Sequence, residues 1–224
     1  MGTAMVEQPV ISVRGEAHME ADPEVATLEV TVRARDPDRR TVLDRLTTRN
    51  TQMLDLIKGY GEAVEKLESG AASVYPDIKH KERAERVKGY LGQASARVVI
   101  RDFTVLGELM ARLADGELVT VEGPWWSLRP DSPVYREARI AAAQDATRRA
   151  GEYAHAFGGE LGRLIEAADT GLLTGDPQHA MAAGGLLRAS LAEPAGMDFE
   201  PVKQTVTAQV DARFGMLLPE LRHG

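Results

Sequence analysis

The 224-residue chain contains no cysteine. It therefore has no disulfide, no thiol nucleophile and no thiolate metal ligand, although this absence does not fix the cellular compartment. No apolar run approaches the roughly 20 residues that a membrane-spanning helix needs. Basic residues are also in the minority, with 27 lysines and arginines against 34 acidic residues and a net charge of −7. Nucleic acids and anionic membranes favour basic surfaces, so neither is an expected partner.

The first residues, MGTAMVEQPVISVRG, lack the basic stretch followed by an apolar stretch that is typical of a signal peptide. Glu7, Gln8 and Pro9 interrupt any such run. Residues 1–9 are therefore expected to be a disordered terminus, and the predicted location of the protein is the cytoplasm.

Sequence patterns for catalysis and cofactor binding are missing as well. The chain has no phosphate-binding Gly-Lys-Ser/Thr loop, no glycine fingerprint after a strand and no Gly-x-Ser-x-Gly turn. Its five histidines are scattered, and no two have the spacing of metal ligands. No pair of carboxylates stands out for acid–base chemistry. We therefore predict that the protein is not an enzyme and has no catalytic residues, metal or cofactor.

The clearest element is a helix that begins at Ser132 and Pro133. Ser132 can cap the helix, and proline is favoured at the first helical position. Gly158 and Gly159 follow as an end signal. The helical period predicts that one stripe packs against a sheet, made of Ile140, Ala143, Ala146, Ala150, Ala154 and Phe157.

Alternating apolar and polar residues predict seven strands around three helices. Strands are expected at residues 10–17, 25–34, 63–75, 90–101, 118–128, 161–168 and 202–214. The first long helix opens at Asp36-Pro37-Asp38, where an aspartate is interpreted as a cap and, alternatively, as a metal ligand. Asp102 is expected to cap the helix at 103–114. The order β-β-α-β-β-α-β-α-β-β predicts an α+β fold with mostly antiparallel sheets.

Residues 10–214 are predicted to form one domain, followed by a C-terminal tail at 215–224. The charged stretch at 79–88 mixes both signs and is interpreted as a solvated hairpin tip. Residues 170–200 lack periodicity and form a predicted irregular loop within the domain. Ordinary connections are much shorter, so this loop is expected to be either disordered or used as an arm that packs on a neighbouring subunit.

Two features suggest an interface between subunits. Neighbouring strand residues face opposite sides, so of Trp125 and Trp126 only one can enter the same core. Trp126 fits the buried register with Leu128, and Trp125 then points outward as an interface anchor, unless a helix covers it. Within the loop at 170–200, the apolar candidates for the interface are Met181, Leu186 and Leu187.

A set of short motifs resembles the SIMPL-domain family over about residues 10–214. These motifs are Ile11 to Glu16, Asp22-Pro23, Ser73 to Pro76, Gly89-Tyr90, Ala94-Ser95, Ser127-Leu128, Ala138-Arg139, Ala142, Ala146, the helix end at 150–158 and Leu161-Gly162. The family includes periplasmic oxidative-stress-defence proteins and a bacterial surface immunogen. The resemblance implies an α+β fold, large ring-like or channel-like homo-oligomers, and a role in stress tolerance or the cell envelope. It implies no catalytic residues.

The chain departs from this family by having no visible leader and by carrying two tryptophans where one aromatic residue is usual. The resulting hypothesis is a non-catalytic protein that assembles with itself and has a stress-related or scaffolding role. An alternative is a module that binds a small molecule or peptide, with residues 170–200 as a lid. A third is a hydrolase with a dispersed site.

Overall fold

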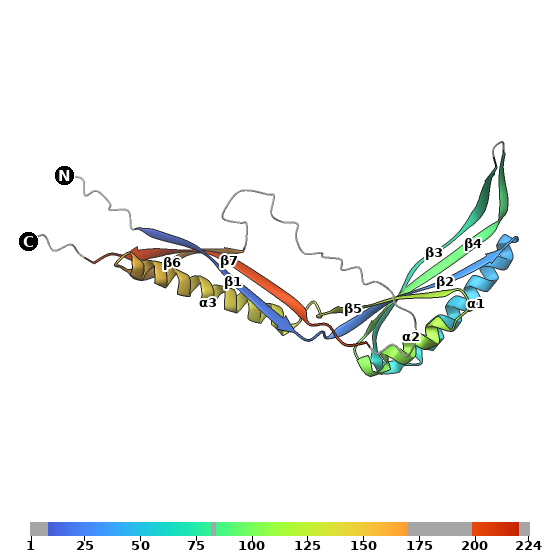
Figure 1. Cartoon of the computed structure of the whole chain (residues 1–224), viewed down its shortest axis with the longest axis horizontal. Coiled ribbons are helices and arrows are strands. Elements are labelled where there is room, and N and C mark those ends of the chain that lie inside the picture. Colours follow the sequence, from blue (N-terminus) through green and yellow to red (C-terminus); the bar gives the residue numbers. More distant parts are fainter. Residues whose placement is uncertain (1–8, 82–83, 170–198, 220–224) are drawn as a thin grey trace, which may run out of the picture. The chain divides into compact units, whose positions relative to one another are not determined.

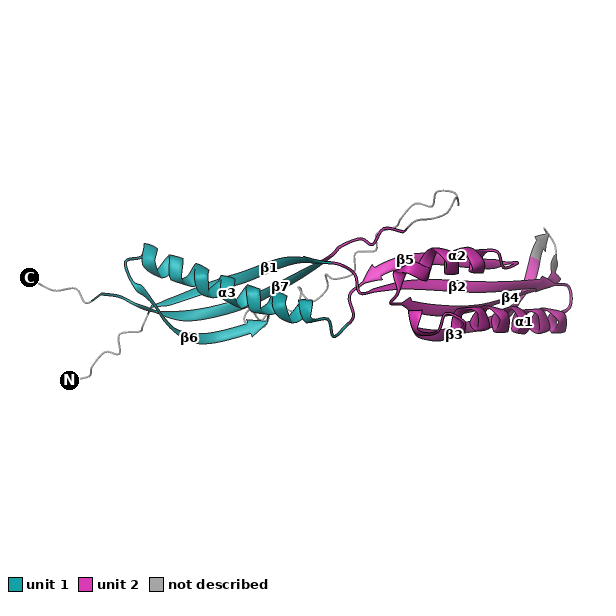
Figure 2. Ribbon diagram, turned by 90° about the horizontal axis from the view of Figure 1, so that it is seen from below, with its two compact units in different colours: residues 1–21, 130–191, 205–224 teal, residues 22–129, 192–204 magenta. Residues whose placement is uncertain are grey.

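A computed structural model describes residues 9–81, 84–169 and 199–219. The range expected to form one domain contains two compact units (Figure 2). The first unit comprises residues 1–21, 130–191 and 205–224, and the second comprises residues 22–129 and 192–204. The predicted order of strands and helices is confirmed.

The second unit is a four-stranded antiparallel sheet in the order β3-β4-β2-β5. Its strands are β2 (Val25–Asp36), β3 (Val64–Lys81), β4 (Ala84–Ile100) and β5 (Val119–Ser127). Two helices, α1 (Arg39–Lys58) and α2 (Leu106–Ala114), cover one face (Figure 1). Alternation along β2 places Leu28, Val30 and Val32 in the core beneath these helices.

Helix α1 begins as expected, because the side chain of Asp38 accepts a hydrogen bond of 2.8 Å from the backbone N–H of Thr41. The second predicted cap is also present at Asp102, although the α-helix itself begins only at Leu106. Asp102 accepts from the N–H of Thr104 and starts a short 3-10 helix at Phe103–Val105, which leads into α2. The β3 and β4 strands also run beyond their predicted ends at 75 and 90, so residues 79–81 and 84–88 of the charged stretch lie within the two arms of the hairpin.

The first unit is a three-stranded sheet in the order β1-β7-β6 with α3 on one face (Figure 1). Its elements are β1 (Val10–Ala21), α3 (Pro133–Ala156), β6 (Glu160–Asp169) and β7 (Gln204–Leu217). Helix α3 begins at the predicted Ser132 cap and Pro133. The sheet therefore pairs the first strand of the chain with the last one.

Helix α3 approaches β1 unusually closely at Gly15. A Cβ at Gly15 would lie only 2.0 Å from the carbonyl oxygen of Ala142 and 2.7 Å from the Cβ of Ala146. The buried stripe of the helix consists of alanines at every fourth position, namely Ala138, Ala142, Ala146, Ala150 and Ala154.

The predicted stripe on α3 was therefore wrong in part. Ala143 is exposed, Ile140 is 46% exposed and Phe157 is 68% exposed. The closeness of the two backbones explains the difference, because it leaves room only for methyl groups at the contact. The larger side chains lie away from it.

Candidate functional site

The two tryptophans lie near the end of β5 and face opposite sides of the four-stranded sheet. Trp126 pairs with Ala26 and packs against the core, where its ring meets Phe103 edge-on at 4.8 Å. Trp125 pairs with Thr27 and is 42% exposed. The predicted orientation of both side chains is confirmed. Gly123-Pro124 lies within β5, an edge strand whose register with β2 shifts between Thr27 and Glu29.

Trp125 belongs to a face of the sheet that neither α1 nor α2 covers. We call it the Trp125 face. The strand register assigns to it Thr27, Glu29 and Thr31 of β2, Thr120, Glu122 and Trp125 of β5, and Ser95, Arg97 and Val99 of β4. Most of these side chains are hydroxylic or charged, so the indole of Trp125 is the largest apolar group among them.

The charges on the Trp125 face form a row across the sheet. Glu29 lies opposite Glu122 on one side and opposite Arg97 on the other, and Arg97 in turn lies opposite Glu68 of β3. Lys66 bonds Glu68 at 2.6 Å, which holds the pKa of Glu68 below its usual value. The row carries charges of both signs, with the like charges of Glu29 and Glu122 next to each other, and it suits a polar contact.

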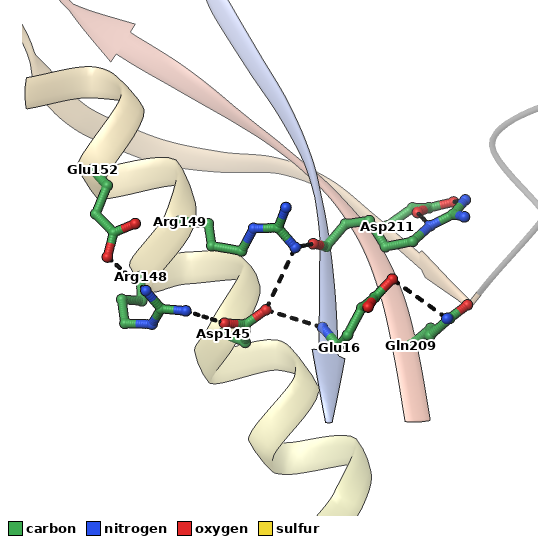
Figure 3. Close-up of polar contacts among 8 residues, drawn as sticks. Glu16, Asp145, Arg148, Arg149, Glu152, Gln209 and Asp211 are labelled. Carbon is green, nitrogen blue, oxygen red and sulfur yellow. Dashed lines mark hydrogen bonds and ion pairs between the residues drawn. The ribbon is translucent and has the colours of Figure 1, made fainter. Parts of the chain in front are cut away.

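A second polar cluster joins α3 to β1 in the first unit (Figure 3). The carboxylate of Asp145 accepts a hydrogen bond of 3.0 Å from the backbone N–H of Glu16 and pairs with the guanidinium of Arg148. One turn further along, Arg149 donates to the carbonyl oxygen of Arg14 at 2.6 Å. The Glu16 N–H, followed by the Arg148 guanidinium, lowers the pKa of Asp145.

Arg14 of β1 and Asp211 of β7 form a bidentate ion pair with two hydrogen bonds. The Nε–Oδ1 distance is 2.7 Å and the Nη2–Oδ2 distance is 3.1 Å. The carboxylate of Asp211 is largely buried, and its hydrogen bond raises the pKa of Arg14. Because the two residues are 197 positions apart, sequence spacing offers no signal for this contact. Both charges are engaged with each other, which indicates a structural tie between strands.

No arrangement for metal binding is present in the described ranges, where no three His, Asp or Glu side chains converge. His18 lies 3.3 Å from the hydroxyl of Thr207, and His155 is exposed on α3. An open hollow of about 540 Å³ lies beside the start of α3, next to Tyr135, Arg136 and Arg139. Its lining also includes Asp131 and Ser132, and the Ser132 side chain caps the start of α3.

Of the four interface candidates from the sequence, the structure places only Trp125. Met181, Leu186 and Leu187 lie outside the described residues, as do the loop at 170–198 and the terminus at 1–8. Sequence patterns missed the polar cluster around Asp145, because the Glu16 N–H and the Arg14 carbonyl come from β1, which is distant in the chain. The helices of the described part include none that is both long and apolar enough to span a bilayer.

Similarity to known proteins supports the family resemblance. The chain is 30% identical over 199 residues to the 26 kDa periplasmic immunogenic protein of Brucella melitensis, covering 84% of this chain and 76% of that protein. It is 24% identical over 154 residues to the uncharacterized protein YggE of Escherichia coli strain K12, covering 69% of this chain and 63% of that protein. Neither name indicates catalysis.

A likeness to a solved structure is too distant to carry an argument. This structure, of a putative amidohydrolase/peptidase from Burkholderia cenocepacia, is 17% identical, with a TM-score of 0.25 over 61% of this chain and 35% of that one.

The predicted cytoplasmic location was wrong. The Brucella melitensis relative and its counterpart in Brucella abortus are both named as periplasmic proteins. The prediction rested only on the composition of the first residues, which says little about where a mature protein resides. The model of the SIMPL family, described as a protein of unknown function (DUF541), matches residues 11–214. With this match over both units, the chain belongs to the SIMPL family.

Proposed function

We propose that this chain is a non-catalytic periplasmic protein that assembles with copies of itself and has a stress-related or scaffolding role. The observation that carries the proposal is Trp125, a large aromatic side chain that is 42% exposed on a sheet face without a helix cover. Exposed tryptophans surrounded by polar groups are typical anchors of protein interfaces.

The surroundings of Trp125 favour a protein partner over a small ligand. Its neighbours on the strands, Thr27 and Glu122, belong to a sheet face that bears hydroxyl groups and charges of both signs. Such a surface supplies the polar rim of an interface, with the indole as its apolar centre. Small ligands instead prefer concave, mostly apolar sites.

The alternative of a binding module with a lid at residues 170–200 gains no support, because nearly all of that segment lies outside the described residues. The hydrolase alternative gains none either, because Ser132, the serine that lines the hollow at the start of α3, accepts the capping hydrogen bond from the Val134 N–H.

Measurement of mass in solution by light scattering tests the assembly. We expect a homo-oligomer at micromolar concentration, and a clean monomer would overturn the proposal. Trp125→Ala is expected to reduce the mass while leaving the circular dichroism spectrum unchanged. Leu43→Ala is the matched control, since Leu43 is similarly exposed but lies on α1.

The cellular part of the proposal requires separate experiments. Fractionation of cells that produce the full-length protein is expected to recover it with periplasmic markers. A deletion strain is expected to tolerate oxidants or envelope damage less well than its parent, and equal survival of the two strains under both stresses would contradict the stress-related role.

A further inference from the structure

The two sheets have four edge strands, and three of these are irregular. The β5 edge contains the shift next to Gly123-Pro124, the β3 edge shifts register three times, and the β6 edge shifts twice. Bulges and shifts of this kind hinder pairing with another chain. Among the described edges, β1 is the exception.

Four contacts show that β1 is regular against β7. Pro9 meets Met216, Arg14 meets Asp211, Glu16 meets Gln209, and His18 meets Thr207. The two residue numbers in each contact have the same sum, which is the signature of antiparallel pairing without a bulge. The hydrogen bond from Met216 N–H to the Pro9 carbonyl then assigns the backbone groups of odd-numbered β1 residues to β7. The backbone groups of even-numbered β1 residues therefore point to the free edge of the sheet.

Side chains of α3 already block the middle of this free edge. Asp145 accepts from the outward N–H of Glu16, and Arg149 donates to the outward carbonyl of Arg14. In the part of the chain that the structure describes, the outward groups of Val10 and Ser12 have no such cap. The outward backbone groups in the middle of the β1 edge are therefore hydrogen-bonded to α3, whereas α3 caps none of the described groups near the start of this edge.

The row of α3 residues that contains Asp145 and Arg149 continues with aromatic side chains toward the end of the helix. After Asp145 and Arg149, the next residues at four-residue spacing are Tyr153 and Phe157, which are 48% and 68% exposed. Four helical residues advance about 6 Å and two strand residues about 6.6 Å, so Tyr153 lies roughly level with Ser12 and Phe157 with Val10. The open part of the edge thus coincides with the two exposed aromatic side chains of α3.

We propose that residues 10–14 of β1 pair antiparallel with the same residues of a second copy of this chain, which joins two three-stranded sheets into one. This inference rests on the proposed self-assembly and specifies one of its contacts. In the register, Ser12 lies opposite Ser12 of the second copy, and Val10 lies opposite Arg14. It is the longest symmetric pairing that stops short of the Glu16 N–H held by Asp145. Because Arg149 already holds the Arg14 carbonyl, the pairing forms about four backbone hydrogen bonds, which join Ser12 to Ser12 and the Arg14 N–H to the Val10 carbonyl.

The alternation of β1 favours a second β1 as the occupant. An added strand must place apolar residues on the helix side and polar residues on the other, as β1 does with buried Ile11 and Val13 and exposed Ser12. The proposed register sets Ile11 opposite Val13 of the second copy. A register displaced by four residues and centred on Arg14 would bring the Arg14 side chains of both copies opposite each other, and like charges so placed repel.

The absence of cysteine permits a direct test. Ser12→Cys, treated with a short bifunctional thiol reagent, is expected to yield a cross-linked dimer as its main product. Thr207→Cys is the matched control, because Thr207 is also exposed but lies on β7, the central strand. We expect at least a fivefold lower dimer yield from it.

A second variant tests the backbone pairing. Ser12→Pro removes an N–H that the ladder with β7 does not use, and it is expected to weaken self-association at least tenfold in analytical ultracentrifugation. If this variant does not fold, as judged by circular dichroism, the cross-linking yield decides alone. An oligomeric wild type with equal yields for the two cysteine variants would overturn the β1 contact and leave the proposed function standing. A monomeric wild type would overturn both.

Discussion

Gly15 of β1 and Ala142 of α3 are in such close contact that a single methyl group does not fit between them. A Cβ on Gly15 would lie 2.0 Å from the Ala142 carbonyl oxygen and 2.5 Å from the Ala146 nitrogen. Both of these are backbone atoms, so the helix as a whole would have to move away from the sheet. Gly15 therefore sets the distance between the two layers of the first unit.

Gly15→Ala is expected to destabilise the protein by about 3 kcal/mol or more, at the upper end of the cost of overpacking a core. Urea unfolding followed by circular dichroism measures the change. Gly151→Ala serves as control, because a Cβ at Gly151 meets no atom within 4 Å and alanine favours the helix. The control should gain up to about 1 kcal/mol, and equal effects at both sites would contradict the close packing.

The neighbouring tryptophans should differ in their contribution to stability. Trp126→Ala removes the edge-on contact with Phe103 and part of the core, which is expected to cost about 3 kcal/mol. Trp125→Ala should change the free energy of unfolding by less than about 1 kcal/mol in dilute, dissociated protein. Guanidinium titrations of the two variants provide the comparison. A larger loss of unfolding free energy in Trp125→Ala than in Trp126→Ala would mean that Trp125, and not Trp126, faces the core.

The register shift within β5 depends on Gly123. Its φ of 113° lies in a region that side chains rarely adopt, and a Cβ there would also lie 2.7 Å from the Thr27 carbonyl oxygen. Gly123→Ala is expected to cost about 2 kcal/mol or more. Hydrogen exchange should then show faster exchange of the amides of residues 120–127 than of those in β4. Unchanged protection in β5 would contradict the requirement for glycine.

Asp145 should contribute to the pH dependence of stability. Its pKa is lowered in the folded protein by the Glu16 N–H and by Arg148, so the carboxylate stabilises the fold above the unfolded pKa of about 3.9. This contribution is lost as the pH falls through the lower, folded pKa. Asp145→Asn is expected to be less stable than wild type at pH 7, with a smaller difference at acidic pH.

Thermal unfolding between pH 7 and pH 2.5 measures this convergence. Glu137→Gln, also on α3, is the control, since the described residues offer Glu137 no hydrogen bond or ion pair. At pH 7 its stability should differ little from that of wild type. Parallel curves for Asp145→Asn and wild type would contradict the role of the carboxylate.

Local patterns predicted most of the fold because each depends on neighbouring residues. The caps at Ser132 and Asp38, the alternation of β2 and the opposite orientations of Trp125 and Trp126 all follow from residues a few positions apart. The alanine stripe of α3 did not follow from the helical period alone. Which residues of α3 form the buried stripe depends on Gly15, which lies more than 120 positions away in the chain.

Long-range contacts also explain what the sequence could not show at the candidate sites. The Arg14–Asp211 pair and the Asp145–Glu16 contact link segments that only the folded chain brings together. The presence of two compact units was not predicted either, because no linker separates them. The chain leaves the first unit after β1 and returns to it at α3.

This path has a consequence for synthesis on the ribosome. The second unit is built almost entirely from one continuous stretch, residues 22–129, so it can fold soon after it emerges. The first unit needs β7, the last strand, between β1 and β6. Until translation is nearly complete, β1 and the alanine face of α3 have no central strand to join. A nascent chain stalled before residue 204 should therefore contain a folded second unit and an incomplete first unit. Addition of β7 is then the step that completes the native fold.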